Sequence, residues 1–127
     1  MEVEGSLSGI RVLVVEDEFL LALSLEEELR RAGAEIVGPY NSLAAALEGA
    51  KQQAFDVATL DVNLAGEMVY PLADMLMHEG RPFLFVSGYV GANMPERFRS
   101  FTRLPKPYDP DGLIAQLREL ALAGKAE

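Results

Sequence analysis

Five short apolar runs alternate with longer segments of helical period along these 127 residues, and the alternation has no gap. The runs, which we expect to be strands, cover residues 10–15, 34–40, 56–60, 82–87 and 101–104. Strands that alternate with helices predict parallel βαβ units with right-handed crossovers. The first run, IRVLVV, is dense in β-branched residues, which is typical of a strand buried on both faces.

The segments between these runs carry helical signals. In residues 18–33, Leu21, Leu25 and Leu29 recur at a spacing of four, and Gly33 is suited to end a helix. Further helices are expected at 41–53, at about 68–79, within 91–100 with Pro95 in the first turn, and at 110–124. A (βα)₅ chain of this length predicts a flavodoxin-like three-layer α/β sandwich with a parallel sheet in the order 2-1-3-4-5.

Composition excludes several classes of function. The net charge of −9 argues against direct nucleic-acid binding, which needs a positive field. The chain has no cysteine, and its single histidine, His78, cannot build a histidine metal site. No apolar run approaches the roughly 20 residues of a membrane helix, and residues 1–9 lack the features of a secretory signal. We therefore expect a cytoplasmic protein without membrane insertion.

Polar side chains follow four of the expected strands. The first strand runs into Glu16 and Asp17, the third into Asp61, the fourth into Ser87 and the fifth into Lys106. In a doubly wound sheet these carboxyl ends meet near the switch in strand order, where ligands bind. A hard cation such as Mg²⁺ relieves the repulsion between clustered carboxylates. Asp61 can then act as a nucleophile toward a phosphoryl group, whose oxygens the metal, Lys106 and Ser87 would neutralise.

The fragments VVEDE, LDVNLAG, FVSGY and LPKPYD together resemble the receiver domain of two-component response regulators, over roughly residues 9–123. The resemblance implies that a histidine kinase or a phosphotransfer protein phosphorylates Asp61. It implies that Glu16, Asp17, Asp61 and the backbone carbonyl of Asn63 bind Mg²⁺, for which Mn²⁺ can substitute.

The same resemblance assigns the residues that respond to phosphorylation. Ser87 resembles the switch hydroxyl and Lys106 the phosphate-sensing lysine, and the bond between Lys106 and Pro107 is usually cis in the family. The implied protein is a switch rather than a classical enzyme, with self-catalysed phosphoryl transfer and autodephosphorylation at most.

We expect a receiver domain over 9–123, short tails at 1–8 and 124–127, and no output domain. The signal would leave through a protein partner bound around the fourth helix, fifth strand and fifth helix, or the chain would act as a phosphate sink. The run FVSGY resembles a Phe-x-Ser/Thr-Gly-Tyr motif of alphaproteobacterial receivers, which often stand alone and pair with histidine kinases of the HWE type.

Three positions concern switching. Ala65 stands where family members usually carry proline, which predicts a looser loop. Arg103 replaces the usual switch aromatic, and an arginine cannot enter an apolar pocket without a large desolvation cost. Tyr89 lies where family members shield the phosphoryl group and so tune its lifetime.

Other classes of protein stay open. An aspartate-nucleophile phosphohydrolase would carry a second acidic residue where this chain has Asn63. A pseudo-receiver, an interaction module that is not phosphorylated, would normally lose part of the acidic–Asp–Lys set, which is intact. Flavin binding is disfavoured because Glu16 and Asp17 occupy the place of a phosphate-cradling loop.

Overall fold

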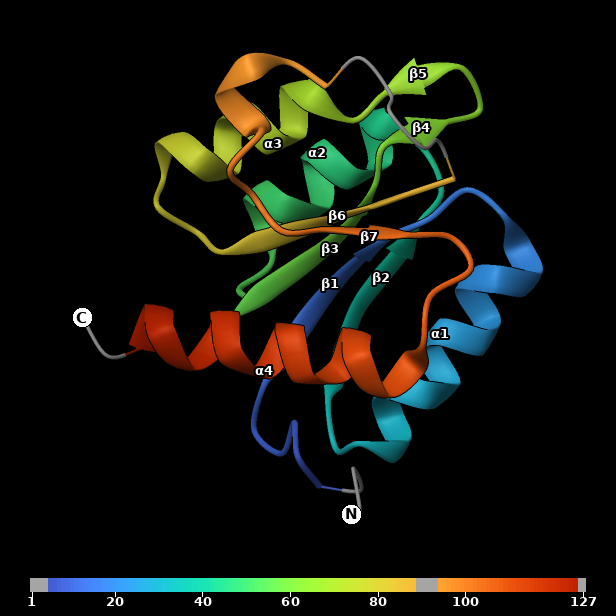
Figure 1. Ribbon diagram of the computed structural model, residues 1–127, viewed down its shortest axis with the longest axis vertical. Helices are drawn as coiled ribbons and strands as arrows, with labels where there is room; N and C mark the ends of the chain where they lie inside the picture. Colours follow the sequence, from blue (N-terminus) through green and yellow to red (C-terminus); the bar gives the residue numbers. More distant parts are fainter. Residues whose placement is uncertain (1–4, 89–93, 126–127) are drawn as a thin grey trace.

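The chain folds into a three-layer α/β sandwich around a five-stranded parallel sheet (Figure 1). A computed structural model describes residues 5–88 and 94–125. The elements are β1 (Arg11–Val15), α1 (Phe19–Arg31), β2 (Glu35–Tyr40), α2 (Leu43–Gln52), β3 (Val57–Asp61), β4 (Asn63–Leu64), β5 (Glu67–Met68), α3 (Tyr70–His78), β6 (Phe83–Ser87), η1 (Glu96–Phe98), β7 (Arg103–Pro105) and α4 (Pro110–Lys125). The sheet order β2-β1-β3-β6-β7 confirms the predicted order 2-1-3-4-5, because β4 and β5 form a separate hairpin.

Helices cover both faces of the sheet, as Figure 1 shows. The helices α2 and α3 lie on one face together with η1, and α1 and α4 lie on the other. Two hydrophobic cores result, one between the sheet and the α2–α3 layer and one between the sheet and the α1–α4 layer. Because side chains alternate along a strand, Leu13 and Val15 of β1 lie in the α2–α3 core, and Val12 and Val14 lie in the α1–α4 core. The central strands β3 and β6 are buried at every residue. Among the described residues, no helix is long and apolar enough to cross a membrane.

The connections around α3 and before β7 differ from the prediction. Residues 63–68 form the short antiparallel hairpin β4–β5, so α3 begins at Tyr70 instead of about residue 68. In place of the expected fourth helix, the described residues have one 3₁₀ turn, η1, for which Pro95 is the N-cap. Hydrophobic periodicity could predict neither the β4–β5 hairpin nor η1, because β4, β5 and η1 are each only two or three residues long.

The folded unit also includes residues ahead of the expected boundary at residue 9. Leu7 is fully buried beside α1, and its N–H donates to the carbonyl of Ala32 at 2.8 Å. Gly33 follows with φ of +98°, and a Cβ at this position would lie 2.8 Å from the Ser8 hydroxyl oxygen. Gly33 therefore lets α1 end in the left-handed conformation and lets the 5–9 turn pack closely against it.

We expect Leu7→Ala to lower the free energy of unfolding by about 2–4 kcal/mol, because it leaves a cavity in the core beneath α1. Leu20→Ala is the matched control, since Leu20 is 73% exposed and should change stability by less than about 0.5 kcal/mol. Urea unfolding of both variants measures the difference. Equal stabilities of the two variants would show that residues 5–9 are a tail.

Candidate functional site

The carboxyl ends of four strands bring the predicted polar residues to one edge of the sheet. Asp61 is the last residue of β3 and lies beside Val86 of β6 in the parallel register. The backbone N–H of Lys106, which follows β7, donates to the carbonyl of Ser87 at 2.8 Å. Glu16 directly follows β1, and its N–H donates to the carbonyl of Tyr40 at 2.9 Å. Strand pairing therefore sets the positions of these side chains.

One ammonium group lies between two buried carboxylates. The Lys106 Nζ atom is 3.0 Å from Glu16 Oε1 and 3.1 Å from Asp61 Oδ2. Glu16 is 4% and Asp61 5% exposed, so both carboxylates have lost most of their hydration. Asp17, which is half-buried, completes a cluster in which one oxygen of each of the three carboxylates lies within 4.8 Å of the others. Three carboxylates against one ammonium leave the cluster negative.

Burial and the charges of neighbouring groups shift the pKa values of Asp61 and Lys106. Burial, followed by repulsion from Glu16, raises the pKa of Asp61 to about 7, although Lys106 acts in the opposite direction. Burial alone would lower the pKa of Lys106, but its hydrogen bonds with Glu16 and Asp61 outweigh this and raise it. Lys106 is therefore charged at neutral pH, whereas Asp61 changes its charge near pH 7 in the absence of a cation.

The donor set suits a hard divalent cation. Glu16, Asp17 and Asp61 offer carboxylate oxygens, and a bound cation would supply the positive charge that Lys106 alone cannot. The space beside them is a cavity of about 470 Å³, open to solvent. Its lining residues are Asp17, Glu18, Asp61, Asn63, Ala65, Gly66, Ser87, Gly88 and Lys106. The cavity therefore combines the three kinds of group that the sequence predicted: carboxylate, hydroxyl and ammonium.

The loop after Asp61 is more regular than the sequence predicted. Asn63 Oδ1 accepts a hydrogen bond from the Gly66 N–H at 2.7 Å, and Ala65 and Gly66 have φ values of +53° and +96°. Two successive positive φ values define the tight two-residue turn of a β-hairpin. Proline, whose ring fixes φ near −65°, cannot adopt the conformation of Ala65. The expectation of a looser loop is therefore wrong.

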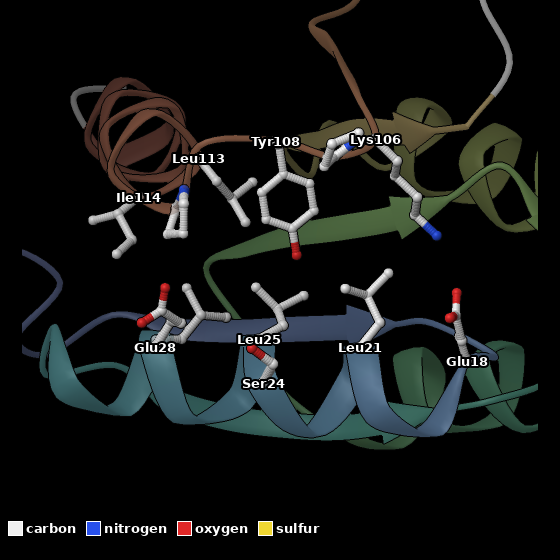
Figure 2. Close-up of a pocket in the computed structure, with 12 residues that line it drawn as sticks. Glu18, Leu21, Ser24, Leu25, Glu28, Lys106, Tyr108, Leu113 and Ile114 are labelled. Atoms are coloured by element: carbon white, nitrogen blue, oxygen red, sulfur yellow. The ribbon is translucent and has the colours of Figure 1, made fainter.

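A second cavity adjoins Lys106 on the other side of the β7–α4 connection. It measures about 350 Å³ and lies between α1 and α4 (Figure 2). The Tyr108 hydroxyl points into it, facing Leu21 and Leu25 of α1. Burial, together with the charge of Glu16, raises the pKa of Tyr108 to about 12, so this hydroxyl stays neutral. Tyr108 lies in the fragment LPKPYD, but no sequence pattern indicates that its hydroxyl lines a cavity between two helices.

The remaining predicted residues lie away from the carboxylates or outside the described part. Pro107 follows a cis bond from Lys106 and lines the groove between α1 and α4. Arg103 is exposed at the start of β7 and lines a different cavity, together with Met94, Phe98, Arg99 and Phe101. Tyr89 lies outside the described residues.

The fold and the site define a doubly wound receiver-like domain with a carboxylate and lysine centre. A scan of family models and a search of curated proteins both found no match. Among solved structures, SdrG from Sphingomonas melonis Fr1 is 34% identical, with a TM-score of 0.77; the match covers 96% of this chain and 99% of that one. The chain therefore belongs to the receiver-domain family of response regulators.

Two less similar structures agree in fold. The receiver domain of the Francisella response regulator 1452 is 21% identical, with a TM-score of 0.78, and the match covers 91% of this chain and 98% of that one. The response regulator PhyR from Brucella abortus is 23% identical with a TM-score of 0.78. That match covers 92% of this chain and 49% of PhyR, so the chain spans about half the length of PhyR.

The raised pKa of Asp61 predicts that the metal-free protein loses stability as pH rises. The folded state binds this proton more tightly than the unfolded state, so the free energy of unfolding falls between about pH 4 and pH 7, by up to about 4 kcal/mol. Asp61→Asn removes the buried charge but also weakens the hydrogen bond that Lys106 Nζ donates to this side chain, because an amide oxygen is uncharged. We expect it to be more stable than the natural chain by about 2 kcal/mol at pH 8 and by less than about 1 kcal/mol at pH 5. Urea unfolding at both pH values, with chelator, measures this; a pH-independent difference would contradict it.

The positive φ of Ala65 predicts that glycine is better at this position. We expect Ala65→Gly to raise the free energy of unfolding by about 0.5–1 kcal/mol, because only the methyl group opposes the left-handed conformation. Ala44→Gly makes the same chemical change within α2 and should lower stability by about 1 kcal/mol. Thermal unfolding of the two variants should therefore shift in opposite directions. A shift in the same direction would be inconsistent with the turn.

Proposed function

We propose that this chain is a phosphorylation-controlled switch in two-component signalling, with Asp61 as the phospho-acceptor. The observation that carries the proposal is the Asp61 carboxylate, which lies at an open cavity, 3.1 Å from the Lys106 ammonium group and beside two further carboxylates. The donor is a sensor histidine kinase, such as one of the HWE type, or a phosphotransfer protein.

Each residue has a role in the proposed reaction. An Asp61 oxygen attacks the phosphorus of a phosphohistidine, the P–N bond breaks, and an acyl phosphate forms. Glu16, Asp17, Asp61 and the Asn63 carbonyl would hold Mg²⁺, or Mn²⁺ in its place, which supplies positive charge to the phosphoryl oxygens. Lys106 is already charged and within reach of the Asp61 carboxylate, so it can leave that carboxylate and pair with the phosphoryl group.

The surface of α1 beside the site supports docking of a phosphodonor protein. Phe19, Leu20 and Leu23 are 76%, 73% and 52% exposed, which is unusual for large apolar side chains so close together. The apolar groove in Figure 2 continues from α1 to Pro107 and Tyr108, directly next to Lys106. A donor bound there would lie beside the cavity that contains Asp61.

The proposed output involves the side of the molecule that carries η1, β7 and α4. Ser87 and Lys106 would move toward the phosphoryl group, and their displacement would reach β7 through the hydrogen bond from Lys106 N–H to the Ser87 carbonyl. The resemblance of the run FVSGY to the motif of stand-alone alphaproteobacterial receivers supports this proposal, and Tyr89 would shield the phosphoryl group. The signal then passes to a protein partner, or the chain acts as a phosphate sink.

Two alternatives make different predictions about Asp61. A phosphohydrolase would need a second acid–base group, and the structure places the Asn63 side chain in a hydrogen bond within the β4–β5 turn. A pseudo-receiver would fold in the same way but would form no acyl phosphate. The intact set of Glu16, Asp17, Asp61 and Lys106 favours the phosphorylated switch.

Intact mass spectrometry after incubation with acetyl phosphate tests the proposal. We expect the natural chain to form one phosphoryl adduct when Mg²⁺ or Mn²⁺ is present and none when both are absent. Asp61→Asn should form no adduct with either cation. Because the acyl phosphate is labile, an adduct that is lost in base but stable to neutral buffer for minutes would identify it. Continuous release of phosphate without an adduct would favour the phosphohydrolase. If neither adduct nor release appears with acetyl phosphate or a phosphorylated phosphotransfer protein, the pseudo-receiver is favoured.

A further inference from the structure

The segment that runs from η1 to the start of the β7–α4 connection has a charge opposite to that of the rest of the chain. Residues 97–108 contain four of the eleven basic residues, Arg97, Arg99, Arg103 and Lys106, and no acidic residue, in a chain of net charge −9. Lys106 is turned toward the carboxylate cluster. The three arginines lie on the outer side of η1 and β7, and all three are exposed.

Arg97 forms an ion pair within the fold. Its Nε atom lies 2.7 Å from Asp74 Oδ1 and its Nη2 atom 2.9 Å from Asp74 Oδ2, a two-pronged pair that ties η1 to α3. Its guanidinium also lies 4.6 Å from the centre of the Phe98 ring. Arg99 and Arg103 have no carboxylate within ion-pair distance in the described part of the chain. Their charges therefore remain available to a partner.

A cavity of about 230 Å³ lies between these two arginines. It is lined by Met94, Phe98, Arg99, Phe101 and Arg103, and Met94 and Phe98 are 6% and 1% exposed. The cavity thus has an apolar floor and a basic rim. Its walls are held in place by ring contacts: Phe98 stacks on Tyr70, and Phe101 stacks on Phe83 with ring centres 4.8 Å apart. The cavity is therefore formed before any partner binds.

We propose that this face binds an acidic segment of a partner protein, with one apolar side chain in the cavity and flanking carboxylates on Arg99 and Arg103. Guanidinium groups pair with carboxylates in a planar geometry, and opposite charges speed encounter with an acidic partner. A nucleic acid is excluded as the occupant because the negative charge of the rest of the chain would repel it.

The inference deepens the proposed function, since it assigns a chemistry to the partner of the face that Asp61 would control. Arg103 of β7 pairs with Phe85 of β6, and Phe85 lies two residues before Ser87 on the same strand. A shift of Ser87 would therefore be passed along β6 to the arginine at the rim. The binding itself requires no phosphoryl group, because the cavity exists in the structure described.

Nuclear magnetic resonance titration of the full, unphosphorylated chain with synthetic peptides tests the proposal. The probe is the acidic peptide EDELFEDE, and the comparison peptides are EDESGEDE, which lacks the apolar anchor, and KRKLFKRK, which reverses the charge. We expect the largest amide shifts at residues 94–104. EDESGEDE should bind at least about tenfold more weakly, and KRKLFKRK should cause no shifts in that range.

The double variant Arg99→Glu/Arg103→Glu should weaken binding of EDELFEDE by at least about tenfold. The variant Arg30→Glu/Arg31→Glu is the matched control, because it makes the same change of charge at two exposed arginines of α1, outside the proposed output face, and it should change the affinity by less than about twofold. Both arginines of the double variant are exposed, so thermal unfolding should be close to that of the natural chain. Equal losses in the double variant and the control would overturn the proposal.

Other outcomes would also contradict the proposal that this face binds an acidic segment. Tighter binding of KRKLFKRK at the same residues, or no shift with EDELFEDE, would overturn it. Shifts at 94–104 that grow with protein concentration in the absence of peptide would assign the face to a second copy of the chain. Phosphorylation of Asp61 is read separately by mass. A chain that can be phosphorylated but binds no acidic peptide refutes this inference alone. A chain that binds the peptide but gains no phosphoryl group from acetyl phosphate or a phosphorylated phosphotransfer protein refutes the proposed function alone.

Discussion

The candidate site at the carboxyl edge of the sheet depends on the ion pairs that the Lys106 ammonium group forms with the carboxylates of Glu16 and Asp61. Two buried carboxylates this close repel each other if nothing compensates their charge. One ammonium compensates only in part, because Asp17 adds a third carboxylate to the cluster. Burial of Asp61, together with this remaining negative charge, raises its pKa to about 7 and so keeps a proton on it up to that pH. The same charge makes the site receptive to a divalent cation, and without such a cation it would repel an anionic phosphoryl group.

The core of the sheet is what holds these charges at the same edge. Because β3 and β6 are buried at every residue, a slip of one residue in their pairing would exchange the side chains of the two cores. Packing therefore specifies the register, and the register places Asp61 beside Val86, one residue before Ser87. The backbone hydrogen bond between Lys106 and Ser87 then fixes the fifth strand relative to the fourth of the sheet. The chemistry at the edge is thus a consequence of apolar packing in the middle.

The features predicted correctly from the sequence are those with a local signal. The alternation of strands and helices predicted the sheet order, and the polar residues at strand ends predicted that Glu16, Asp61 and Lys106 would meet. What was missed depends on contacts between distant segments or on rare conformations. The burial of Leu7 requires the end of α1, the groove at Tyr108 requires two helices to pack, and the β4–β5 hairpin requires a φ of Ala65 that alanine rarely adopts. The chemical roles of the site residues remain predictions, since they concern a phosphorylated state.

The replacement of the usual aromatic by Arg103 is matched by rings that other elements contribute. Phe83 and Phe85 of β6 contact Phe98 and Phe101, and these rings fill the layer between the sheet and η1. An arginine cannot enter such a layer without losing its hydration, so Arg103 stays exposed at the rim of the cavity. Arg103 therefore adds a positive charge to the surface at a position where the family resemblance predicts an aromatic ring. In this chain, one residue, Arg103, accounts both for the absence of an aromatic ring at this position and for part of the positive charge of the proposed binding face.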